Sequence, residues 1–201
     1  MPGYFKLVNA IYLMSLAAWL AALASAGIAA GNVFGVLDDM SLELERYATY
    51  PSQEHGMLAA GHVMEGVFVT VDLIQIVAIP LTLLALGMQL AVYRLPVRSP
   101  ANAVRTLCLV AATGLFAYHA TALAPRMNRE LRARWSAAEA GDVAAARAHQ
   151  IAFNQDHPTA DLILKTNLIL LIIALGASAA ALSPSAPSAS PRLPEPKLGG
   201  Q

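Results

Sequence analysis

Three ionisable side chains stand in an otherwise apolar segment, residues 59–75, with the sequence AAGHVMEGVFVTVDLIQ. His62, Glu65 and Asp72 are spaced at i, i+3 and i+10, which places them on one face of a helix. Imidazole and carboxylate groups bind transition metals and also carry protons. The spacing therefore predicts a polar site on a helix that is apolar elsewhere.

Residues of the same types recur at two later positions along the chain. His119 lies shortly before Pro125, and His157, Asp161 and Lys165 follow one another at steps of four. In an antiparallel bundle these positions share one end, so the sequence predicts a metal or small-ligand site formed by His62, Glu65, His119, His157 and Asp161. The alternative is that they are interfacial polar residues bonded to one another or to water. His55 and His149 are expected to be loop residues without a special role.

Asp72 and Lys165 lie deeper in their apolar segments than the other ionisable residues. A lone charge in the hydrocarbon core costs at least about 2.5 kcal/mol on insertion scales. We therefore expect an intramembrane ion pair between Asp72 and Lys165. Protonation of Asp72, or its participation in a proton or ion pathway, is the alternative.

Other cofactor chemistry is less favoured by the sequence. Facing histidines on membrane helices can hold haem, but these histidines gather toward one membrane face, which excludes a two-haem path and leaves a single b-type haem as a minor alternative. Cys108 is the only cysteine, so an intrachain disulfide or a CxxC site cannot form. No Ser/His/Asp order or phosphate-binding loop is found, and we expect a protein that is not an enzyme.

The composition indicates the elements that position these residues. Of 201 residues, 57% are hydrophobic and 13% charged, and the mean hydropathy is +0.53, which indicates an integral membrane protein. The formal net charge is zero, and no basic stripe is present. A nucleic-acid partner is therefore excluded.

Apolar runs predict an all-α, integral membrane four-helix bundle, with helices at about 7–31, 58–93, 103–124 and 158–182 of a domain spanning 1–182. The first run is also compatible with a cleaved signal, although its length favours retention. Pro80 predicts a kink in the second helix. Residues 127–153 predict an extramembrane amphipathic helix at the membrane surface, and the Pro- and Ser-rich residues 183–201 predict a disordered tail.

Small residues and positive charges suggest packing and orientation. Gly27, Gly31 and Gly35 form two consecutive small-xxx-small spacings, which predict close packing inside the bundle or, alternatively, a homodimer contact. The short segment from Arg94 to Arg105 carries three arginines and shares a side with Lys6. This distribution favours cytoplasmic termini in a multi-pass protein of a bacterial-type inner membrane.

Four segments stand out in order along the chain: AAWLAALASAGIAAGNVF, AAGHVMEGVF, ALAPRMNREL and FNQDHPTADLILKTNLILL. Together they resemble a family of small four-helix membrane proteins of unknown function, which includes the human transmembrane protein associated with cisplatin resistance. The resemblance rests on the pair Pro125 and Arg126 and on Phe153, His157 and Asn167, and it implies a four-helix membrane fold. We expect a protein that binds a metal ion or small ligand. The alternative is an accessory subunit of a larger membrane complex.

Overall fold

The computed structural model describes residues 2–182, and all regular elements in this range are helical. The predicted tail at 183–201 lies outside the described residues. The long helices are α1 (Pro2–Asp39), α2 (His55–Ala91), α3 (Pro100–Tyr118), α4 (Ala124–Glu139) and α5 (Val143–Leu182). Two short 3-10 helices, η1 (Glu45–Tyr47) and η2 (Ser52–Glu54), lie between α1 and α2, and a π-helical turn, η3 (His119–Leu123), joins α3 to α4.

Four helical stretches are long and apolar enough to cross a membrane: Gly3–Asp39, Ser52–Ala91, Pro100–Glu139 and Val143–Ala181. The predicted all-α fold with four apolar helices is therefore confirmed. Each stretch has 37 to 40 residues. At about 1.5 Å per residue this is close to 60 Å, about twice the thickness of a hydrocarbon core of about 30 Å.

The helices are apolar over only part of their length. Every acidic side chain among the described residues lies between 38 and 72 or between 130 and 161. We call residues 31–72 and 119–161 the loop half of the molecule, and residues 3–30, 73–118 and 162–182 the terminal half. The terminal half alone has the length and composition of a lipid-embedded bundle, so Asp72 and His119 fall at the junction of the two halves.

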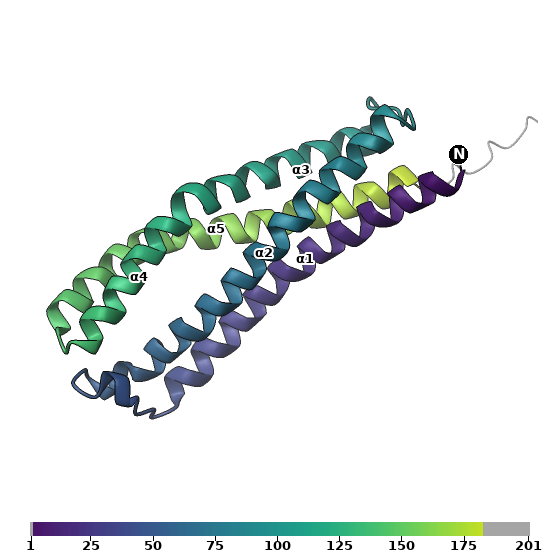
Figure 1. Cartoon of the computed structure of the whole chain (residues 1–201). Coiled ribbons are helices and arrows are strands. Elements are labelled where there is room, and N and C mark those ends of the chain that lie inside the picture. Colours follow the sequence, from purple (N-terminus) through teal and green to yellow (C-terminus); the bar gives the residue numbers. More distant parts are fainter. Residues whose placement is uncertain (1, 183–201) are drawn as a thin grey trace, which may run out of the picture.

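The chain forms two antiparallel hairpins, one made by α1 and α2 and the other by the continuous α3–η3–α4 segment and α5 (Figure 1). The hairpins lie against each other in the terminal half, where α1 contacts α5. They diverge in the loop half, and η1 contacts α4 there. The start of α1 and the end of α5 lie at the same end of the molecule.

The sequence predicted that the third apolar helix ends at residue 124, just before Pro125, and this is wrong. The chain continues through η3 into α4, and Pro125 occupies the first turn of α4. Proline lacks an N–H, and the π-turn directly before it changes the hydrogen-bond register at this point, so the helix is not broken. α4 therefore extends the third span.

The predicted amphipathic helix over 127–153 is also wrong as a single element. It is divided by a turn at Ala140–Asp142, where Gly141 has a φ of +72° that favours glycine. The Asp142 carboxylate accepts a hydrogen bond from the Ala145 N–H at 2.9 Å and caps the start of α5. Residues 124–139 and 143–157 thus pack as an antiparallel pair, and the predicted position at the membrane surface stays a prediction.

Several other helix ends lie further out than the sequence predicted, although α2 ends at Ala91, two residues before its predicted end. α1 continues to Asp39 and α2 begins at His55. α5 begins at Val143, so Pro158 lies inside it and not in its first turn. Pro80 lies inside α2, which continues past it, and the predicted kink stays a prediction.

The largest buried cluster fills the terminal half, with Tyr12, Leu16, Trp19, Leu109 and Leu171 fully covered. The predicted glycine packing is formed only in part. A Cβ at Gly27 would lie 4.0 Å from Cδ2 of Leu164, whereas a Cβ at Gly31 or Gly35 would meet no atom of the described residues within 4 Å. Close internal packing is therefore not formed at Gly31 and Gly35, and the homodimer contact stays a prediction.

Candidate functional site

His62 belongs to an aromatic contact that joins the two hairpins in the loop half. Its Nε2 lies 2.7 Å from the Tyr47 hydroxyl, and its ring stacks on Trp135 with centroids 3.9 Å apart. We call Tyr47, His62 and Trp135 the clasp. Because these residues come from η1, α2 and α4, the clasp holds the α1–α2 hairpin against α4.

His55 organises the loop between α1 and α2, whereas the sequence predicted that it has no special role. It is 3% exposed, its Nδ1 accepts the Leu44 N–H at 3.0 Å, and its Nε2 lies 3.0 Å and 3.2 Å from the carbonyls of Tyr47 and Tyr50. Only the neutral imidazole protonated at Nε2 can make all these bonds. Burial raises the pKa of the Tyr47 and Tyr50 hydroxyls above their usual value, so both stay neutral hydrogen-bonding groups.

Ion pairs account for most charged side chains of the loop half. Glu65 accepts from Arg132 at 3.0 Å, which links α2 to α4. Asp161 accepts from Lys165 at 2.6 Å, at the i, i+4 spacing on α5. Lys165 therefore pairs with Asp161, and the predicted pair with Asp72 is not formed.

The five predicted ligands are not gathered at one point. His62 lies in the clasp, Glu65 and Asp161 are in separate ion pairs, and His157 is exposed on α5 and stacks on Phe153 at 5.5 Å. Within residues 2–182, no group of three His, Cys, Asp or Glu side chains is placed to hold a metal ion. The five-residue centre predicted from the sequence is thus divided among unrelated contacts.

His119 and Asp72 are brought together at the junction of the halves. The Asp72 carboxylate is half-buried and accepts a hydrogen bond from the Gln75 amide at 3.2 Å, and Gln75 in turn accepts from the Trp19 indole at 2.9 Å. His119 lies close enough to interact electrostatically with Asp72. We call Trp19, Asp72, Gln75 and His119 the inter-hairpin site.

Two groups at this site lack the partners that usually accompany buried polar atoms. Nδ1 of His119 is buried and has no hydrogen-bond partner within residues 2–182, and Asp72 makes no ion pair with a lysine or arginine of this range. His119 is the first residue of η3, and single π-turns inside helices recur at functional sites. The inter-hairpin site therefore offers one imidazole nitrogen without a partner and one carboxylate without a lysine or arginine partner, which are donor types that a cation accepts.

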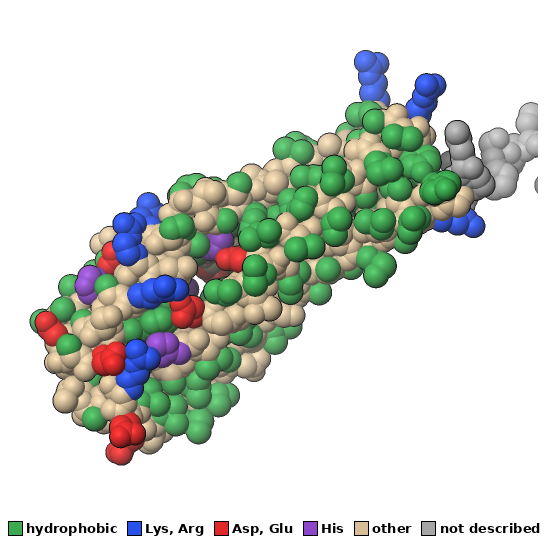
Figure 2. Space-filling view, viewed as in Figure 1, with side chains coloured by type: hydrophobic (Ala, Val, Ile, Leu, Met, Phe, Trp, Pro, Cys, Tyr) green, Lys and Arg blue, Asp and Glu red, His purple; other side chains and the backbone are tan. Residues whose placement is uncertain are grey.

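The molecule is hollowed between the diverging hairpins. Histidine and acidic side chains gather at this hollow, next to the apolar surface of the terminal half (Figure 2). Gln75 and Trp19 are 3% and 0% exposed, so the polar chain that starts at Asp72 leads into the core. Sequence spacing could not reveal it, because it joins residues from different helices.

The comparisons with known proteins add no functional assignment. No protein-family model matches the chain, and searches of curated proteins and of solved structures find no significant match. The resemblance to the four-helix family drawn from short motifs therefore stays a prediction.

Proposed function

We propose that the protein is a multi-pass protein of a bacterial-type inner membrane that binds a small cation, such as a divalent transition-metal ion, between Asp72 and His119. The single observation behind the proposal is an acidic side chain at the edge of the apolar span with a histidine beside it and no basic partner. A carboxylate in such surroundings is costly unless its charge is balanced. The proposed role is binding, without catalysis.

The donor set suits a cation that keeps part of its hydration shell. A carboxylate oxygen and an imidazole nitrogen are both ligands that first-row transition metals accept, and the remaining positions would be filled by water from the hollow. Gln75 supports the site as a positioning residue, since its amide donates to Asp72 while its oxygen is held by Trp19. Outer partners of this kind fix the orientation of a ligating side chain.

The charge distribution supports the proposed orientation. Lys6, Arg94 and Arg98 lie in the terminal half or its connecting turn, where the described residues contain no acidic side chain. Arg46, Arg126, Arg132 and Arg134 in the loop half are instead paired with carboxylates. This difference favours a cytoplasmic terminal end.

The orientation is tested by cysteine labelling in a Cys108→Ser background. We expect Val97→Cys to be labelled from the cytoplasmic side only and Asp142→Cys from the opposite side only. The reverse pattern would contradict the orientation.

The binding proposal is tested by metal titration of the full chain in detergent. We expect stoichiometric Co²⁺ or Zn²⁺ binding by calorimetry, weakened at least tenfold in Asp72→Asn and in His119→Gln. Matched controls are Asp161→Asn and His157→Gln, which change the same residue types on exposed positions of α5. Absence of binding by the unaltered protein, or equal loss in the controls, would contradict the proposal. A haem-type absorption spectrum would instead support the single-haem alternative.

A second candidate is an accessory subunit of a larger membrane complex. The observation that favours it is the open space beside Gly31 and Gly35 on α1, where another helix backbone could approach closely. Metal-free protein that co-purifies stoichiometrically with one partner, and loses it on Gly31→Leu, would support this candidate. Retention of the partner by Gly31→Leu would contradict it.

A further inference from the structure

Arg105 is fully buried in the terminal half, far from the inter-hairpin site. Its side chain extends from the second turn of α3 and is 0% exposed. Nε and both terminal nitrogens are buried, and none has a hydrogen-bond acceptor among the described residues. A guanidinium carries five N–H donors and cannot lose its charge in a protein. The terminal half thus contains a permanent cation that interacts with the Tyr12 side chain but has N–H donors left without an acceptor.

The surroundings of Arg105 are polar but carry no negative charge. The guanidinium lies over the ring of Tyr12 at 5.4 Å, and the Tyr12 hydroxyl lies 2.7 Å from that of Ser178 on α5. Asn102 lies one turn before Arg105 on α3, and its Oδ1 is buried without a partner, as is Oε1 of Gln89 on α2. Three helices, α1, α3 and α5, therefore bring polar groups to Arg105.

No carboxylate of residues 2–182 can balance this charge, because all of them lie in the loop half or at its edge. The attraction of the Tyr12 ring recovers only part of the hydration that a buried guanidinium loses. An arginine buried among amide and hydroxyl groups instead matches the geometry that recognises a phosphate, which the planar fork binds with two parallel hydrogen bonds.

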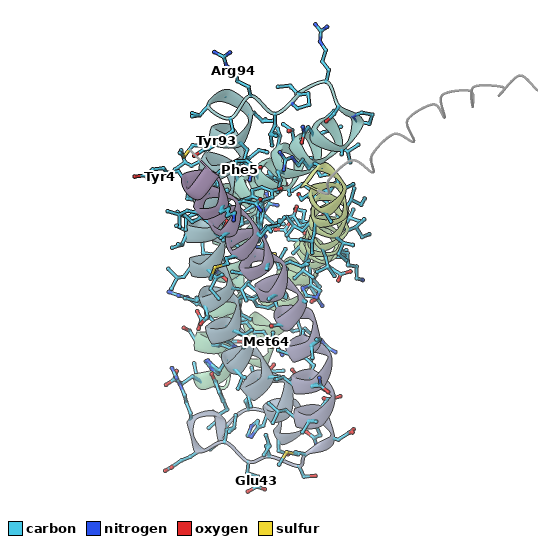
Figure 3. All side chains as sticks on the ribbon, turned by 90° about the vertical axis from the view of Figure 1, so that its right-hand side faces the viewer. Tyr4, Phe5, Glu43, Met64, Tyr93 and Arg94 are labelled. Carbon is cyan, nitrogen blue, oxygen red and sulfur yellow. The ribbon has the colours of Figure 1, made fainter. Side chains whose placement is uncertain are left out.

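The position of Arg105 along the helix indicates where the phosphate comes from. It lies five residues after Pro100, or about 7 to 8 Å along the helix axis, which is the depth of a headgroup layer. Tyr4 and Tyr93 lie at the same end of the molecule as Arg94, opposite Glu43 (Figure 3), and Phe5 packs on Tyr93 with centroids 5.0 Å apart. Aromatic residues of this kind mark a membrane interface.

We propose that Arg105 is the anchor of a binding site for the phosphate of an anionic phospholipid at the terminal end of the bundle. Lys6, Arg94 and Arg98 surround this end and raise the local concentration of anionic headgroups. The Asn102 side chain, one turn before Arg105, donates one N–H to the Pro96 carbonyl at 2.9 Å, and its second N–H would complete the site. Because the guanidinium is covered by its own neighbours, headgroup entry requires the ends of α1 and α3 to part.

The test measures the thermal stability of the full chain in neutral detergent with added phosphatidylglycerol, phosphatidylcholine or inorganic phosphate. Unfolding is followed by the reaction of the buried Cys108 thiol with a fluorogenic maleimide. We expect phosphatidylglycerol to raise the midpoint by several degrees and phosphatidylcholine to leave it unchanged. Stabilisation by inorganic phosphate with no further gain from the lipid would overturn the lipid as the source.

Two variants distinguish the buried anchor from general charge. Arg105→Lys keeps the positive charge but loses the planar guanidinium that makes two parallel hydrogen bonds. We expect the phosphatidylglycerol concentration that gives half of the maximal stabilisation to rise about tenfold in this variant. Arg147→Gln removes an exposed arginine of the loop half and should respond within twofold of the unaltered protein. If Arg105→Lys does not fold, Asn102→Leu provides the same comparison, with an expected rise of at least threefold. An equal response of unaltered protein and anchor variants would overturn the proposal.

Discussion

The clasp is expected to be the main contact that keeps the hairpins together in the loop half, and Trp135→Ala tests this. Trp135 is 6% exposed, stacks on His62 at 3.9 Å, and covers Gly61, whose Cβ would lie 3.5 Å from the indole. Burying a tryptophan removes about 200 Å² from solvent, and at about 25 cal/mol per Å² this is about 5 kcal/mol as an upper bound. Alanine retains a small part, so we expect a loss of about 3 to 4 kcal/mol.

This loss should appear as local opening instead of global unfolding. Since about 1.4 kcal/mol corresponds to a factor of ten, amide hydrogen exchange of residues 124–139 should accelerate more than a hundredfold. The buried Cys108 thiol reports on the terminal half, and its maleimide labelling should stay slow. Trp135→Phe is the control, because it keeps most of the apolar contact and should accelerate exchange about tenfold or less.

Two results would refute the reasoning. If Trp135→Ala and Trp135→Phe accelerate exchange equally, the burial of the indole is not what holds α4 in place. If Cys108 becomes labelled in step with the exchange of residues 124–139, the two halves unfold as one unit and the hairpins are not held separately at their two ends.

Three further predictions concern the loop half, each measured as thermal unfolding of the variant in detergent. Gly56→Ala should destabilise by about 1 to 3 kcal/mol, because the new Cβ would lie 2.0 Å from the Leu37 carbonyl oxygen and force α1 and α2 apart; an unchanged midpoint would contradict this close approach. Gly141→Ala should cost about 1 to 2 kcal/mol, since φ is +72° there, and Gly141→Asn should cost less. Arg126→Gln should cost less than about 1 kcal/mol, although its nitrogens lie 2.6 Å and 2.7 Å from Asp156, because the pair is exposed; a larger loss would show that the pair is shielded from solvent.

Helix existence could be predicted from the sequence, whereas helix length could not. Apolar runs of about 20 residues are unambiguous, because a lipid-embedded backbone must satisfy its own hydrogen bonds. The runs ended where charged residues began, so the expected helices ended there too. The third and fourth helical stretches continue for about four further turns, to Glu139 and back to Val143. Ala-rich, charged sequence is helical in water when a neighbour supplies contacts, as Trp135 and the Arg126–Asp156 pair do. For the same reason Pro125 was misleading as a stop signal and Pro158 as a start signal.

The sequence identified residues of the candidate site but not which of them meet between helices. Asp72 and His119 were both singled out for their chemistry, and the i, i+4 spacing of Asp161 and Lys165 already contained their pairing on one helix. The spacing along one helix fixes which residues share a face, but not which faces of different helices meet. That relation depends on the rotation of each helix, and in the third span on the π-turn at His119, for which the sequence gives no clear signal.

Ionisable groups in the segment 59–75 are tolerated because only its last residues enter the terminal half. In that half, lipid tails are as apolar as leucine side chains, so cohesion depends on close packing and on bonds such as Tyr12–Ser178 and Thr82–Ser15. In the loop half, water drives Trp135 into contact with His62. Asp72 lies at the boundary between the terminal half, where close packing provides the cohesion, and the loop half, where the hydrophobic effect does. The proposed cation would be reached from the water side, while Gln75 and Trp19 hold the Asp72 carboxylate against the core.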